Sequence, residues 1–211
     1  VAIGEQALRY NTTGANNTVV GSNAGLNITT ADCNVAIGKS ALVDNTTGAG
    51  NVAVGVVALE RNTTASNNTA LGYKALLSGT TGASNTAVGA EAMKFHTTGA
   101  NNVAVGKDAL LSNTTASDNS AFGHSSLRVN TTGINNSAFG YRSLPSNTTG
   151  AESVGIGYQA LNANTTGSNN VAVGKNSAPA ITTGNGNSVL GDNAGKQITT
   201  GSNNTAIGGE S

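Results

Sequence analysis

The sequence has few charges and few aromatic residues. Only 9% of its 211 residues are charged and 3% are aromatic, and it contains no Trp. Ten basic side chains balance ten acidic ones, so the formal net charge is zero. Proteins that bind nucleic acids or anionic membranes rely on an excess of positive charge. We therefore expect neither partner for this chain.

Cysteine, proline and long apolar runs are also scarce. The single cysteine, Cys33, cannot form an intrachain disulfide and offers no cluster of metal ligands. No apolar run approaches the ~20 residues that span a membrane, and no signal peptide opens the chain. We expect any targeting or anchoring segment to lie outside these residues, as in a fragment of a longer fibre or surface protein.

What the sequence has in abundance is repetition. When each repeat is numbered so that its most regular glycine stands at position 4, twelve 17-residue repeats and a seven-residue partial repeat fill residues 1–211 without insertion or deletion. We interpret the chain as a single repeat array. The position 4 glycines are Gly4, Gly21, Gly38, Gly55, Gly72, Gly89, Gly106, Gly123, Gly140, Gly157, Gly174, Gly191 and Gly208.

Each repeat predicts short extended segments joined by turns. Positions 1 to 3 carry Val, Thr or Ser, then mostly Ala, then an aliphatic residue or Phe, a pattern typical of a strand that ends at the glycine. Positions 12 and 13 are Thr in all twelve repeats, and we expect three extended pieces separated by Gly and Asn corners. Such a unit suits no helix pair. The fold class predicted is all-β, a parallel β-solenoid with one repeat per coil and about twelve coils.

Differences between repeats predict which positions share space. Position 8 is Leu or Met in nine repeats, whereas Gly25, Ala178 and Gly195 stand there in the other three. Constant core volume would explain why a large residue always occurs at one of two positions. The partners of these three small residues at position 11 are Ile28, Ile181 and Ile198. We expect these isoleucines to be buried, and we expect the position 11 corner to change conformation where Ile replaces Asn, Gly or His.

A second exchange links positions 1 and 3. Phe122 and Phe139 at position 3 accompany Ser120 and Ser137 at position 1, so we expect both positions to point the same way, into the core. Position 17 is Asn in every repeat except for Ser153, and we expect a ladder of stacked amides that satisfies buried corner groups.

The repetition disfavours catalysis, because an active site brings unlike residues together at one place. His96 occupies an Asn-type corner and His124 a variable turn, and neither lies at a recognisable triad or metal-ligand spacing. We therefore expect no enzyme, no metal site and no cofactor.

Two surface features are candidates for binding. The first is a set of tyrosines at position 5, Tyr73, Tyr141 and Tyr158, which could stack on sugars. The second is a column of hydroxyls at position 12, predicted to face outward if position 11 faces inward. Its members are Thr12, Thr29, Thr46, Thr63, Thr80, Thr97, Thr114, Thr131, Thr148, Thr165, Thr182 and Thr199.

The repeats resemble a known type of surface protein. The segments NNVAVGKDALLSNTTAS and GIGYQALNANTTGSNNVAVG are similar to the repetitive shafts of phage tail fibres and to the YadA-type heads of trimeric autotransporter adhesins. The resemblance covers the whole chain and implies a left-handed parallel β-roll, commonly a homotrimer, displayed outside the cell or on a virion.

The expected function is a structural or adhesive rod that presents a tip or side surface to a cell-surface or glycan receptor. We expect copies to associate along the small alanines of positions 2 or 7. The alternative is an ice-binding solenoid that uses the position 12 threonines.

Overall fold

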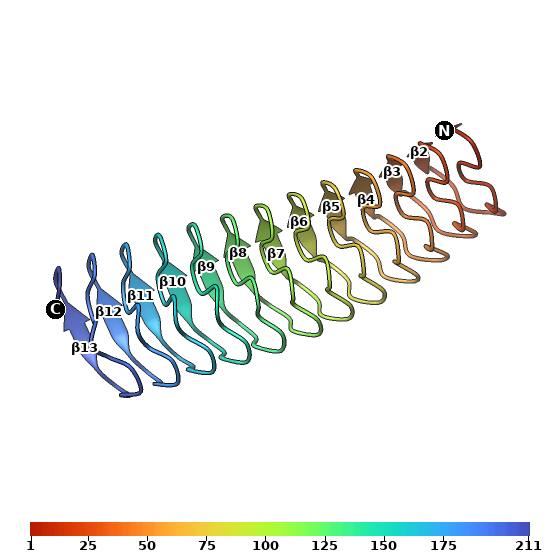
Figure 1. The fold of residues 1–211 in the computed structure, drawn as a ribbon. Helices are drawn as coiled ribbons and strands as arrows, with labels where there is room; N and C mark the ends of the chain where they lie inside the picture. The colour runs from red at the N-terminus through yellow and green to blue at the C-terminus, as the bar shows by residue number, and fades with distance from the viewer.

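The protein is a rod of stacked coils, described over residues 1–211 by a computed structural model (Figure 1). Each repeat forms one coil and contributes one short strand, and thirteen strands form a single parallel sheet in sequence order. No helix long and apolar enough to cross a membrane is present. The strands are β1 (Ala2–Ile3), β2 (Thr18–Val20), β3 (Val35–Ile37), β4 (Val52–Val54), β5 (Thr69–Leu71), β6 (Thr86–Val88), β7 (Val103–Val105), β8 (Ser120–Phe122), β9 (Ser137–Phe139), β10 (Val154–Ile156), β11 (Val171–Val173), β12 (Ser188–Leu190) and β13 (Thr205–Ile207).

Neighbouring strands pair with equivalent positions opposite one another. In β7 and β8, for example, Val103 pairs with Ser120 and Val105 with Phe122, an offset of one repeat. The predicted solenoid, with one 17-residue coil per repeat, is therefore confirmed. At an interstrand spacing of ~4.8 Å, about twelve coils make a rod roughly 60 Å long.

The glycine at position 4 ends each strand because no other residue fits there. At Gly106 the backbone has φ +131°, and an added Cβ would lie 2.6 Å from the carbonyl carbon of Gly123 in the next coil. The positive φ and this close approach both exclude a side chain. The regular glycine spacing is thus explained by this close contact between successive coils.

Only the first of the three expected extended pieces is a β-strand. In every coil the residues at positions 6, 8 and 16 have positive φ, as Asp108 (57°), Leu110 (49°) and Asp118 (60°) do in coil seven. Left-handed residues interrupt an extended backbone, so the rest of the coil consists of turns and bends. Hydrogen bonds between coils nevertheless continue, for example from Leu110 N to Ser126 O at 3.0 Å.

Near this corner the residue with positive φ stands at position 8, not at position 11. The expectation that the position 11 corner changes conformation where Ile replaces Asn, Gly or His was therefore wrong. Gly25 has φ 53° and Leu42, its equivalent in the next coil, has 54°, while no residue at position 11 has positive φ. The left-handed conformation stays at position 8 whether position 11 holds Asn or Ile, so the exchange does not move it.

The core is built from small residues, with one large side chain in each coil. The residues at positions 2, 7 and 8 are buried in coils two to twelve, as Ala104, Ala109 and Leu110 are in coil seven. Positions 1 and 3 do point the same way, but the prediction that they face the core was wrong. Strand alternation places Ala at position 2 inside the narrow coil, and the bulkier neighbours lie on the outer face of the sheet.

Alanines at positions 2 and 7 cannot hold copies of the chain together. Ala36 and Ala41, for example, are fully buried inside their own coil. The expectation that chains associate along these alanines was therefore wrong, because they face the inside of the coil and no neighbouring chain can reach them.

The exchange between positions 8 and 11 is confirmed. Ile28 and Ile181 are completely buried, and Ile198 is partly buried against the same core. Position 2 takes part as well, since the two coils that have Gly at position 8 carry Val19 and Val189 in place of Ala. Three positions thus share one volume.

The asparagines at position 17 form the expected ladder. Asn102 Oδ1 accepts a hydrogen bond from the Asn119 backbone N at 3.0 Å, and Asn102 Nδ2 donates to Ala116 O at 2.9 Å. Both side chains are fully buried. The exception, Ser153, keeps part of the pattern, because its Oγ accepts from the Asn170 backbone N at 3.2 Å.

Candidate functional site

The threonines at position 12 are half-buried or exposed, but their hydroxyls are largely used within the rod. Thr97 Oγ1 donates to Thr114 O at 2.9 Å, and the same bond recurs from Thr12 to Thr182 in every coil. The threonine that faces solvent in all twelve coils is the one at position 13, such as Thr98 or Thr115. Position 13 is the more exposed member of the pair because the two residues lie on a bend, where the strand alternation that favoured position 12 does not apply.

Two of the three candidate tyrosines form a stack with a histidine. The ring centroids of Tyr141 and Tyr158 are 5.3 Å apart, and those of His124 and Tyr141 are 5.4 Å apart, with nearly parallel planes. All three residues stand at position 5 of successive coils and are exposed. Because the rings stack along the rod, their faces cover one another and their edges point outward.

Tyr73 stands apart from this stack. Its neighbours at position 5 are Val56 and Ala90, and the ammonium of Lys74 lies 4.8 Å from its ring centroid. The hydrogen bond to the Tyr73 side chain raises the pKa of Lys74. The structure therefore does not bring the three tyrosines into one site.

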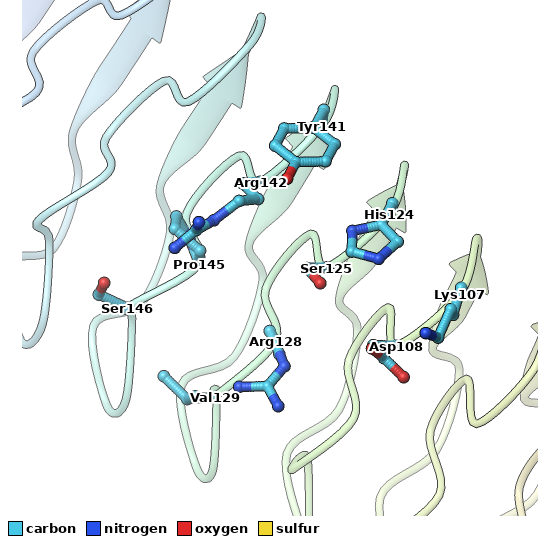
Figure 2. A pocket seen from close by; sticks show the side chains of 10 residues that line it. All are labelled: Lys107, Asp108, His124, Ser125, Arg128, Val129, Tyr141, Arg142, Pro145 and Ser146. Atoms are coloured by element: carbon cyan, nitrogen blue, oxygen red, sulfur yellow. The ribbon is translucent and has the colours of Figure 1, made fainter.

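A single surface hollow adjoins the aromatic stack (Figure 2). It has a volume of about 580 Å³ and extends over coils seven to nine. Figure 2 shows Lys107, His124 and Tyr141 at the same place on three successive coils, with Arg128 extending from a neighbouring turn, away from the row of rings. The residues around it are Lys107, Asp108, His124, Ser125, Arg128, Val129, Tyr141, Arg142, Pro145 and Ser146.

Three cations and one acid surround this hollow. Lys107, Arg128 and Arg142 make no ion pair, since the only two ion pairs of the structure join Lys94 to Glu91 and Lys196 to Glu210. The remaining charge is Asp108. In a chain with zero formal net charge, the hollow is a local concentration of positive charge.

The other histidine, His96, belongs to the core. Its Nε2 lies 2.7 Å from Gly99 O, and its Nδ1 lies 3.1 Å from Asn113 Nδ2. The Asn113 amide donates to Nδ1, so the ring is neutral and donates its proton from Nε2 to Gly99 O. Burial lowers the pKa of His96 below its usual value of 6.5. His96 therefore acts as a substitute for the buried asparagine that most coils have at position 11.

No protein-family model, curated protein or solved structure matches the chain. The likeness to fibre shafts and adhesin heads thus depends on the repeat sequence, and the structure establishes a parallel β-solenoid of about twelve coils. No group of three or more His, Cys, Asp or Glu side chains is placed to hold a metal ion.

Sequence reasoning missed the cations of the hollow and the role of His124 in the stack. It considered position 5 only for its tyrosines and did not compare the charged residues of successive repeats. The signal was present, because the stacking of coils makes equal positions in successive repeats neighbours in space. Reading position 5 down the repeats gives Lys107, His124, Tyr141 and Tyr158 in direct succession.

Proposed function

We propose that this protein is an extracellular structural and adhesive rod that works as a homotrimer, at a cell surface or on a virion. One observation carries the proposal, namely the apolar column at position 3 on the outer face of the sheet. Exposed fractions along this column reach 39% for Ile37, 46% for Leu71, 40% for Ile156 and 50% for Leu190. Contiguous apolar patches on a protein surface mark interaction sites.

The architecture of the sheet supports the same proposal. Parallel sheets are normally covered on both faces, whereas here only the inner face has a core against it. No charged residue stands at positions 1 to 3 of any repeat, so desolvating the outer face buries no charge. A second copy fits this face better than an unrelated partner, because its apolar column has the same spacing along the whole rod. The resemblance to trimeric adhesin heads favours three copies.

Sedimentation of the full chain tests the assembly. We expect a species of three times the 20.6 kDa chain mass. Replacing Ile37, Leu71 and Ile156 together with Lys should dissociate it, because each charge would have to be desolvated in the interface. The matched control replaces the exposed threonines of the same coils, Thr47, Thr81 and Thr166, with Lys and should leave the trimer intact. A single-chain species at every concentration, or equal dissociation of both variants, would refute the assembly.

Ice binding is a second candidate function, favoured by one observation. Position 13 presents an exposed threonine in all twelve coils, next to the half-buried column at position 12. Two adjacent threonine columns with regular spacing are the kind of array that an ice plane requires. Thermal hysteresis of the chain that disappears in the Thr47, Thr81 and Thr166 lysine variant would support this function, and no hysteresis in the chain itself would reject it.

A further inference from the structure

The hollow on coils seven to nine combines unpaired cations with hydrogen-bonding groups and apolar contacts. Arg128 and Arg142 offer guanidinium groups without an acidic partner, and Lys107 adds a third cation on the same side (Figure 2). Guanidinium groups bind carboxylates through paired, charge-assisted hydrogen bonds. Aromatic rings carry partial positive charge on their edges, and the stack of His124 and Tyr141 points its edges outward. Both features favour an anionic group.

The rest of the hollow distinguishes among anionic ligands. Asp108 would repel a polyanion such as a nucleic acid, but its carboxylate can accept hydrogen bonds from hydroxyl groups. Ser125 and Ser146 add hydroxyls that can donate or accept, and Val129 and Pro145 supply apolar surface for C–H groups. A ligand that matches this lining has one negative charge, several hydroxyls and an apolar ring face. Sugars that carry an acidic group have all three.

We propose that this hollow is a binding site for an acidic saccharide, whose anionic group is held by Arg128 and Arg142 and whose hydroxyls bind Asp108 and the serines. The volume of about 580 Å³ lies within the range of small-molecule sites. The inference rests on the proposed adhesive function and gives it a receptor chemistry. It also gives a role to the three unpaired cations that line this hollow.

Binding of two matched sugars to the full chain tests the inference. Methyl glucuronide and methyl glucoside differ in one group, a carboxylate in place of a hydroxymethyl, and their affinities can be compared by ligand-observed NMR and calorimetry. We expect the glucuronide to bind at least about tenfold more tightly, the factor that a charge-assisted hydrogen bond supplies. Glucose 6-sulfate serves as a third probe, because it separates a sulfated from a carboxylated source of the negative charge.

Variants place the binding in the hollow. Arg128→Gln and Arg142→Gln should each weaken binding of the charged sugar by roughly tenfold to a hundredfold. Arg61→Gln, which removes an exposed arginine of coil four, is the control and should bind as the unaltered chain does. Circular dichroism checks that the coils remain folded.

Several outcomes would contradict the proposed saccharide site. Equal affinity for the glucuronide and the glucoside, unchanged binding by the two hollow variants, or no binding of either charged sugar would overturn the inference. Inorganic sulfate that binds as tightly as glucose 6-sulfate would reduce the hollow to a simple anion site and reject the saccharide. A chain that forms trimers but binds no sugar would contradict the saccharide site and leave the proposed trimeric rod standing. Failure of one proposal can therefore be distinguished from failure of the other.

Discussion

Ile28 fills the space beside Gly25. A Cβ added to Gly25 would lie 2.9 Å from Ile28 Cδ1 and 3.3 Å from Cγ2 of Val19, so a leucine at this position would collide with both. Coils with Leu or Met at position 8 have Asn, Gly or His at position 11 and a small residue at position 2. The side chain that fills the centre of the coil can thus come from different positions, provided that its total volume stays constant.

Coil five offers a direct test of this shared volume. Leu76→Ala should cost roughly 2 to 5 kcal/mol of unfolding free energy by leaving a cavity. Gly79→Ile alone should cost about 1 to 3 kcal/mol by overpacking, because a Cβ at Gly79 would lie 3.1 Å from Leu76 Cγ. The double variant reproduces the combination of Ala178 and Ile181 found in coil eleven. It should be more stable than the sum of the single effects by about 1 to 3 kcal/mol.

Urea unfolding of the four proteins measures this coupling. The control pairs Gly79→Ile with Leu71→Ala, a truncation on the outer face, and these two effects should simply add because the side chains do not share space. Additive effects for Leu76 and Gly79 would contradict the shared volume.

The position 17 ladder predicts a graded response to substitution. Asn102→Ala leaves the backbone N of Asn119 buried without a partner and removes one of the two hydrogen bonds that Ala116 O accepts, the other coming from Asn113 Nδ2. A buried group without a partner costs about 1 to 3 kcal/mol. Asn102→Ser should cost less, because Ser153 shows that a serine hydroxyl can accept from the next backbone N. Unfolding free energies that fall in the order Asn, Ser, Ala would bear this out, and equal values for Ser and Ala would contradict it.

The architecture was predictable from the sequence because every coil has the same length. The glycine spacing fixes the register. The exchange of a large side chain between positions 8 and 11, as in Gly25 with Ile28, locates one buried volume from the sequence alone. The direction of positions 1 and 3 was not predictable from their covariation, because Phe122 and Ser120 compensate for one another equally well on either face. What decides the direction is the narrowness of the coil, whose inward position 2 holds Ala or Gly in most coils and Val only where position 8 is Gly.

The binding surface was predictable only in part. The stack of Tyr141 on Tyr158 follows from their equal position in adjacent repeats. The exposure of Thr98 over Thr97 depends on a bend, and the hollow depends on how Arg128 and Arg142 extend from different turns of adjacent coils. Such features arise from backbone angles and side-chain directions that the repeat pattern does not encode.

Burial of His96 predicts that acid destabilises the rod through this one side chain. In the folded chain its pKa is lowered below 6.5 because burial disfavours the charged ring, while the unfolded chain keeps the ordinary value. As the pH falls below about 6.5, the unfolded state takes up a proton that the folded state refuses. Above that pH the contribution of His96 to the free energy of unfolding should therefore not change with pH. Below it, stability should decline, by up to about 1.4 kcal/mol per pH unit, until the folded pKa is reached.

Substitution by the residue most common in this column isolates the effect. His96→Asn restores a side chain that does not titrate and can donate to Gly99 O, as Asn113 Nδ2 donates to Ala116 O at 3.1 Å. Between pH ~7.5 and ~5, urea midpoints of this variant should fall less than those of the unaltered chain, since its unfolded state has one fewer proton to gain. The unaltered chain is the reference, because it differs from the variant only at position 96. An equal decline in both proteins would show that His96 accepts a proton without leaving the coil, contrary to the fixed tautomer that Asn113 and Gly99 impose.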